Sequence, residues 1–204
     1  MDTRKKILDK ALEMFNERGI EYVGLRELAA ILDIRVSNIT YYFPTKDDLV
    51  YALSLELGKA NAEVIVEREN LTMSAFLKML REVFQNHIAF RCLLLSVVHL
   101  MKQNKHLSEA YKHTQKVRNA AMYSNLQALE RSGYLKPKDK AEMDFLVSGI
   151  SLISRFWISE AAISFDQLTA DEQIRHYLIL ISKLLTPYST NKAIKEMDVF
   201  LEKS

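Results

Sequence analysis

The chain has 204 residues, of which 49% are hydrophobic and 26% are charged, and its formal net charge is +2. This length allows a hydrophobic core in one or two domains, and these fractions exclude an intrinsically disordered chain. A charge so close to zero excludes nucleic-acid binding driven by overall charge, so any phosphate binding must depend on local clusters such as Arg4, Lys5 and Lys6.

The first predicted helix begins after Asp2 or Thr3, because either side chain can accept a backbone N–H as an N-cap. Its buried stripe has helical spacing and comprises Ile7, Ala11 and Phe15, flanked by Leu8 and Leu12. Gly19 is expected to end it, since glycine accepts the backbone conformation that commonly terminates helices.

Residues 25–43 contain two short helical patterns with a sharp turn between them. The first repeats apolar residues at three- and four-residue spacing, namely Leu25, Leu28, Ala29 and Leu32. The second buries Ile39 and Phe43. Asp33 lies in the turn and is one of the few non-glycine residue types that accept a left-handed backbone. This pair predicts a helix-turn-helix, whose second helix can lie in the DNA major groove.

The remaining chain is predicted to form further helices. Pro44 closes the second short helix, and Thr45 caps a long helix from Lys46 to about Glu69. The later helical segments are 72–91, a buried stretch at 92–101, 108–132 before Gly133, 137–164 opening at Pro137, 169–186 opening with a capping box, and a last segment near 194–201.

No segment shows the alternation typical of a strand, so the predicted fold class is all-α. A three-helix helix-turn-helix domain over residues 1–46 is expected, joined by the long helix to a helical domain over residues 47–204.

The N-terminal region resembles the TetR family of bacterial transcriptional repressors. The segments that carry the resemblance are ALEMFNERG (11–19), LRELAAILDI (25–34) and NITYYFPTKDDL (38–49). The resemblance implies a DNA-binding domain followed by an effector-binding and dimerisation domain. Three positions depart from the family's usual pattern: Val23–Gly24 replaces a threonine, Asp33 replaces the turn glycine, and Arg35 replaces a capping Ser or Thr.

The recognition-helix side chains expected in the groove point away from the Ile39/Phe43 face, and they are Val36, Ser37, Asn38 and Tyr41. Asn38 could bond adenine, Arg35 could reach guanine or phosphate, and Val36 could touch a thymine methyl. The alternative for the whole group is an ordinary solvated helix face.

Tyr42 and Lys46 resemble the family's phosphate contacts. The alternatives are core packing for Tyr42 and a plain exposed lysine for Lys46.

The resemblance also implies a mostly apolar effector pocket between helices of the second domain. Its candidate residues are Phe84, Tyr111, Met122, Tyr123, Phe145 and Phe156. Each could equally belong to the core. The effector would be a small, hydrophobic molecule.

The helices at 137–164 and 169–186 are apolar over more than one face, so they need cover on several sides. A partner subunit would supply it, with small residues such as Ser148 and Gly149 allowing close helix approach. This matches the four-helix dimer interface that the resemblance implies. A two-fold dimer would place its recognition helices about 34 Å apart on palindromic operator DNA, or further apart on more widely spaced half-sites.

A metal site is weakly indicated. His99, His106 and His113 are seven residues apart and could share a helix face, but a predicted break near residues 104–105 spoils that geometry. No metal and no cofactor are therefore expected. The single cysteine, Cys92, lies in an apolar run and is expected to be an inert core thiol in a reducing compartment.

No apolar run approaches the roughly 18 residues that a membrane helix needs, and the best candidate, 145–158, contains Arg155. The amphipathic start is unlike a signal peptide. A cytoplasmic protein without membrane association is expected.

The sequence thus predicts a homodimeric transcriptional repressor, released from operator DNA when an effector tilts the helix at 46–69. Two alternatives remain. An all-α enzyme would need converging acid/base or nucleophilic groups, and none has a recognisable spacing. A helical adaptor that keeps the fold without sequence-specific DNA binding is favoured by Val23 and Asp33.

Overall fold

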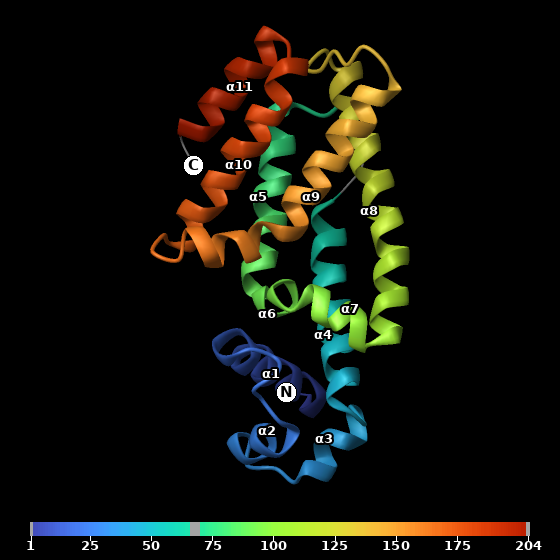
Figure 1. Ribbon diagram of the computed structural model, residues 1–204, viewed down its shortest axis with the longest axis vertical. Coiled ribbons are helices and arrows are strands. Elements are labelled where there is room, and N and C mark those ends of the chain that lie inside the picture. The colour runs from blue at the N-terminus through green and yellow to red at the C-terminus, as the bar shows by residue number, and fades with distance from the viewer. Residues whose placement is uncertain (1, 66–69, 203–204) are drawn as a thin grey trace. The chain divides into compact units, whose positions relative to one another are not determined.

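The computed structural model describes residues 2–65 and 70–202, and every structural statement below concerns these ranges. In chain order the elements are α1 (Thr3–Arg18), α2 (Leu25–Ile31), α3 (Val36–Tyr42), α4 (Lys46–Val64), α5 (Met73–Ala89), α6 (Arg91–Leu95), α7 (Val97–Gln103), α8 (Lys105–Arg131), α9 (Lys140–Ser164), α10 (Ala170–Leu185), a 3-10 helix η1 (Thr186–Tyr188) and α11 (Asn191–Glu202) (Figure 1). The all-α prediction is confirmed for the described part of the chain.

The helices belong to two compact units. The first consists of residues 1–60 and 89–112, and the second of residues 61–88 and 113–204. The chain passes between the units within α4, at the end of α5 and within α8. Neither unit ends at the predicted boundary between residues 46 and 47. A division at that boundary into a DNA-binding and an effector-binding part therefore stays a prediction.

The start of α9 differs from the prediction. Pro137 is not its first residue, because the helix begins at Lys140 with Asp139 as the N-cap. The Asp139 carboxylate accepts a hydrogen bond from the Glu142 N–H at 2.9 Å, which satisfies one of the free donors at the helix start.

The prediction that residues 92–101 are buried is wrong in part, because Leu95 and Val98 are exposed whereas Cys92, Leu93, Leu94 and Leu100 are buried. The stretch forms the end-to-end helices α6 and α7, with Ser96 between them. The predicted end of the long helix at Glu69 lies outside the described residues, and α4 is described to Val64.

Helices α1, α2 and α3 enclose the core of the helix-turn-helix (Figure 1). The buried apolar residues predicted for them are at the centre: Ile7, Ala11, Phe15, Leu28, Ala29, Ile39 and Phe43. Asp2 caps α1, as expected, by accepting from the Arg4 N–H at 3.1 Å. Burial of these periodic apolar residues explains why short helices of only seven residues, α2 and α3, persist here without side-chain caps.

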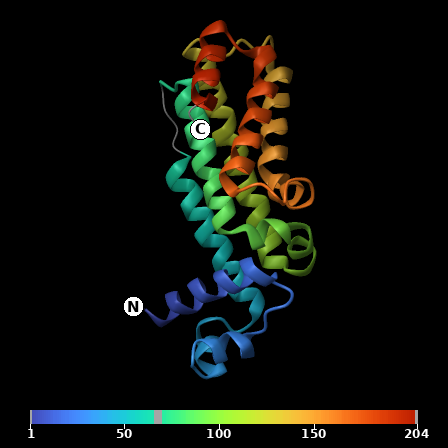
Figure 2. The same cartoon turned by 90° about the vertical axis from the view of Figure 1, so that its left-hand side faces the viewer.

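The second unit is a helical bundle in which α9 and α10 pack side by side (Figures 1 and 2). The predicted capping box opens α10, since Thr169 and Glu172 bond each other's backbone N–H groups. The core contains an aromatic cluster of Phe84, His87, Trp157 and Tyr177. Trp157 donates to His87 Nδ1 at 3.1 Å.

One helix, α9, is long and apolar enough by length and composition to cross a membrane. A buried core helix of a soluble protein passes the same test. Large exposed apolar side chains lie on one face of α9, namely Phe145, Leu152 and Ile163, with Leu180 on the neighbouring α10.

Candidate nucleic-acid interface

The turn between α2 and α3 has the geometry that the sequence predicts. Asp33 adopts a positive φ of 53° and is the one non-glycine residue that does so among those described. The Asp33 N–H donates to Ala30 O at 3.2 Å and the Ile34 N–H donates to Ala29 O at 3.0 Å, which uses the carbonyls left free at the end of α2. A left-handed aspartate thus performs the turn that glycine usually makes.

The departures from the family pattern leave both short helices without a side-chain cap. Gly24 is the N-cap of α2, and Val23 before it is buried in the core. Arg35 is the N-cap of α3 and makes no side-chain capping bond. A cation at the positive end of a helix is locally unfavourable by about 0.3–1 kcal/mol. Arg35 is exposed and has no side-chain partner among the described residues.

Helix α3 is buried on one face and exposed on the other. Ile39 is fully buried, whereas Tyr41 keeps 80% of its surface exposed. The predicted groove residues Ser37 and Asn38 are exposed, and Val36 is half-buried. The Tyr41 and Tyr42 rings meet edge to face, with centroids 5.0 Å apart. The structure therefore gathers the side chains of the predicted recognition face on one short helix.

Lys46, by contrast, is directed into its own unit. It is half-buried, its Nζ donates to the Glu21 carbonyl at 3.3 Å, and it lies 6.0 Å from the centre of the Phe15 ring. Burial lowers the pKa of Lys46, an effect opposed by the negative charges of Glu21 and Asp47. The position has a structural partner in the free protein, and a phosphate contact there stays a prediction.

The start of α4 is fixed directly after α3. Asp48 accepts from both the N–H and the hydroxyl of Thr45, at 2.9 and 2.7 Å, and its own N–H donates to the Thr45 hydroxyl at 3.2 Å. This reciprocal arrangement is a capping box with aspartate in place of glutamate. It explains how the chain leaves α3 at a defined angle.

Ion pairs neutralise much of the local acidity. Residues 1–50 hold eight Lys/Arg and nine Asp/Glu, so this region has no net positive charge. Surface ion pairs join Lys5 to Asp9, Lys10 to Glu13 and Arg18 to Glu27. Arg4 lies 5.2 Å from the centre of the Phe43 ring, which places a cation at the end of α3. Within residues 2–65 and 70–202, neither the Arg35 guanidinium nor the Arg4 guanidinium forms an ion pair with a carboxylate.

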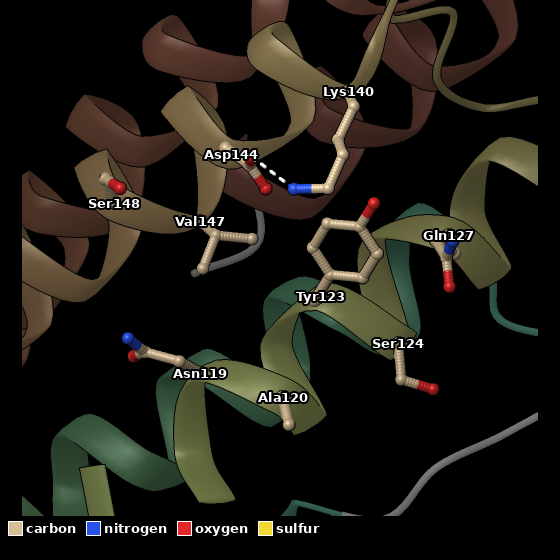
Figure 3. A pocket seen from close by; sticks show the side chains of 9 residues that line it. All are labelled: Asn119, Ala120, Tyr123, Ser124, Gln127, Lys140, Asp144, Val147 and Ser148. Atoms are coloured by element: carbon tan, nitrogen blue, oxygen red, sulfur yellow. Dashed lines mark hydrogen bonds and ion pairs between the residues drawn. The ribbon is translucent and has the colours of Figure 1, made fainter. Parts of the chain in front are cut away.

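The predicted effector residues are not gathered in one place. A cavity of about 650 Å³ lies between α8 and α9, and of the six candidates only Tyr123 lines it (Figure 3). Its other lining residues are mostly polar: Asn119, Ala120, Ser124, Gln127, Lys140, Asp144, Val147 and Ser148. Lys140 bonds Asp144 at 2.6 Å and lies 5.9 Å from the Tyr123 ring centre.

The other five candidates have different surroundings. Phe84 is fully buried, with its ring centre 4.9 Å from that of Trp157, whereas Phe145 is 53% exposed. Met122 and Phe156 are half-buried in the second unit, and Tyr111 belongs to the first unit. A pocket formed by these residues stays a prediction.

Neither the histidines nor the cysteine form a reactive centre in the described part of the chain. His99 lies on α7 and His106 and His113 on α8, and no group of three or more potential metal ligands gathers within residues 2–65 and 70–202. Cys92 is buried, and this burial raises the pKa of its thiol to about 12, so the reactive thiolate is scarce at neutral pH.

Family models match both parts of the chain. One described as "Bacterial regulatory proteins, tetR family" matches residues 7–53, and one described as "Bacterial transcriptional repressor" matches residues 60–197. The chain belongs to the TetR family. It is therefore a transcriptional regulator of that family.

Individual proteins are similar to this chain at low sequence identity. The probable HTH-type transcriptional regulator YttP of Bacillus subtilis (strain 168) is 29% identical over 86 residues, which are 37% of this chain and only 42% of that protein. A TetR-family regulator from Marinobacter aquaeolei VT8 has a TM-score of 0.91 at 22% identity, covering 100% of this chain and 98% of its own. The SmeT–triclosan complex has a TM-score of 0.66 at 14% identity, covering 95% and 94% of the two chains.

Proposed function

We propose that this TetR-family regulator is a cytoplasmic homodimer that represses transcription by binding operator DNA through α3 and is released by a small-molecule effector. The observation that carries the DNA-binding proposal is the exposed face of α3. Tyr41, which is 80% exposed, stands beside the exposed side chains of Ser37 and Asn38, opposite the fully buried Ile39.

The exposed face of α3 does not stabilise the folded protein. An exposed aromatic ring gains no burial energy, and Arg35 at the N-terminus of α3 opposes the helix dipole. Both features are useful against DNA, because Tyr41 can stack or bond along the groove wall while Arg35 reaches a guanine or a phosphate.

Selection of bound fragments from random duplexes tests the DNA-binding proposal. We expect purified protein to select a palindromic site, with affinity that falls steeply as salt rises. Asn38→Ala should then weaken binding to the selected site by about 1–3 kcal/mol and relax the preference at one base pair.

The control is Tyr22→Ala, because Tyr22 is 77% exposed, nearly as much as Tyr41, but lies outside α3. It should bind the selected duplex like the wild type. A protein that selects no duplex at low salt would contradict the proposal and favour a helical adaptor without DNA binding.

The exposed apolar face of α9 and α10 supports a dimer. Phe145, Leu152 and Ile163 lie on one face of α9, and Ile163 is 80% exposed. On the same helix, Gly149 faces α10 so closely that a Cβ there would lie 2.8 Å from Leu184 Cδ2. The two helices thus form a continuous platform whose outer apolar residues a second copy would cover.

Sedimentation of full-length variants tests this dimer. Leu152→Glu places a charge in the proposed interface and should convert the dimer to a monomer. Val117→Glu makes the same kind of change at an exposed valine on α8 and should leave the dimer intact. If Leu152→Glu sediments as the wild type does, this face is not the interface.

The effector site is proposed for the second unit. The open depression between α8 and α9 has a volume of about 650 Å³, within the range that small-molecule sites occupy. Most of its lining side chains are polar, but apolar atoms contribute more of its lining surface, so the lining does not favour a polar ligand over the hydrophobic effector that the sequence suggests. The SmeT–triclosan complex has the same fold, which supports a ligand-binding role.

The effector would act by favouring a conformation in which the two α3 helices no longer fit the operator. Helix α4 begins directly behind α3 and continues into the second unit, so a tilt of α4 would move α3. Adding candidate small-molecule effectors to the protein–operator complex and measuring the affinity of the protein for the duplex tests this step. An effector should lower that affinity.

A further inference from the structure

Residues 89–112 belong to the same compact unit as the helix-turn-helix, although they are distant from it in the sequence. This segment contains α6, α7 and the first turns of α8, and we name it the hinge segment. It begins at the α5–α6 junction, where it also packs against α1, and it continues through the α7–α8 junction.

Asn16 on α1 binds the first junction with both ends of its amide. Its Nδ2 donates to the Ala89 carbonyl at 2.7 Å, and its Oδ1 accepts from the Cys92 N–H at 3.0 Å. Ala89 is the last residue of α5 and Cys92 lies in the first turn of α6. A single side chain thus uses a free carbonyl at the end of one helix and a free N–H at the start of the next.

Asn104, which lies in the second junction, joins the start of α8 to α4. Its Oδ1 accepts from the Leu107 N–H at 2.8 Å and so caps α8, while its Nδ2 donates to the Asp47 carbonyl in the first turn of α4 at 3.4 Å. The side chain is only 6% exposed. A buried amide that loses its partners is costly, so this arrangement tolerates little displacement.

The two asparagines therefore fasten the hinge segment at both junctions, to α1 through Asn16 and to α4 through Asn104. Directional hydrogen bonds define one relative position, whereas apolar contacts alone allow sliding. Helices α5 and α8 leave the segment at these two junctions and continue into the second unit.

We infer that Asn16 and Asn104 are positioning residues that make the hinge segment and the helix-turn-helix one rigid body, through which the ends of α5 and α8 control the DNA-binding helices. The control of the DNA-binding helices in this inference rests on the proposed regulatory function. Its mechanical part, a single cooperative body, can be tested without DNA.

Hydrogen exchange of the full-length protein tests the cooperative body. In the wild type, the protected amides of α1 and of α6–α7 should exchange with one shared opening constant. In Asn16→Ala the hinge segment should open independently, with its amides exchanging about five- to thirtyfold faster relative to those of α1. Asn16→Asp keeps the acceptor for Cys92 but loses the donor to Ala89, so it should give a smaller change of the same kind.

A second arm uses the operator duplex selected from random sequences as the probe. Because coupling between sites is reciprocal, duplex binding should slow exchange in the hinge segment of the wild type. In Asn16→Ala and Asn104→Ala, we expect that slowing to be lost while the slowing in residues 25–43 remains.

The matched control is Asn86→Ala, which removes a similar amide–amide bond, 3.1 Å long, to Asn61 in the second unit. It should keep both the shared opening and the DNA-linked slowing, which separates a positioning role from a general loss of stability. Independent opening of α1 and α6–α7 in the wild type would overturn the inference, as would DNA-linked slowing that survives in both variants. A wild type that binds no duplex defeats the proposed function, and the first arm still decides the cooperative body.

Discussion

His87 should make the second unit sensitive to acid. Its side chain is 5% exposed, its Nδ1 accepts from Trp157, and the Phe84 ring centre lies 5.9 Å away. Burial, reinforced by the positive charge of Arg118, lowers the pKa of His87 to about 3. A proton on Nδ1 would also remove the acceptor that Trp157 uses.

The magnitude follows from the difference between the folded and unfolded pKa values. Because the folded pKa is depressed below the unfolded value of about 6.5, the unfolded chain takes up a proton first as the pH falls. The contribution of His87 is therefore fully present above pH 6.5 and is lost progressively between pH 6.5 and 3. At pH 5 the loss is about 1.5 pH units at about 1.36 kcal/mol each, or about 2 kcal/mol.

Urea unfolding followed by tryptophan fluorescence measures this loss, since Trp157 is the single tryptophan and lies at the site. The test variant is His87→Gln, which does not titrate and retains an amide oxygen as an acceptor. Between pH 8 and pH 5, the wild type should lose about 2 kcal/mol more stability than His87→Gln. His176→Gln, at an exposed histidine on α10, should lose as much as the wild type. Equal losses for wild type and His87→Gln would refute the reasoning.

Three further predictions concern single positions. Thr169→Ala removes the capping box with Glu172 and should lower the unfolding free energy by about 1 kcal/mol in thermal melts, whereas Thr169→Ser should keep it. Equal stability of the two variants would contradict the role of the hydroxyl. Because the backbone is left-handed at Asp33, Asp33→Gly should stabilise the helix-turn-helix and Asp33→Val should destabilise it by about 1–2 kcal/mol. The opposite order of stability in denaturant melts would disprove this explanation. Burial raises the pKa of Glu196, but hydrogen bonds from Tyr134 and Ser74 outweigh it and lower the pKa overall, so the stabilising effect of Glu196 should be present at neutral pH and lost in acid. The unfolding free energy of Glu196→Gln should therefore fall less in acid than that of the wild type, and an equal fall would refute the assignment.

Local patterns in the sequence were sufficient for most of the helices and for their ends. Asp2 and Thr169 are caps that act within three residues of their own position, and the left-handed Asp33 follows from residue type and place in the turn. The buried and exposed faces of α3 follow from spacing alone, since Ile39 and Phe43 are four residues apart. The start of α9 is an exception, because the sequence predicts Pro137 as its first residue, whereas the helix begins at Lys140 with Asp139 as its N-cap.

The tertiary structure decided the roles of individual side chains. Lys46 resembles a phosphate contact in the sequence, yet its partner is a carbonyl 25 residues away, at Glu21. Phe84 and Phe145 look alike as bulky apolar residues, and packing buries the first and exposes the second.

Asn16 carries no local signal at all, because its partners lie 73 and 76 residues further along the chain. Helical periodicity and capping are short-range effects within a few residues, so the sequence by itself determined the helices and the family. Which side chains meet across helices depends on long-range packing, in which hydrogen-bond partners are chosen by the assembled fold, and only the tertiary structure decided that.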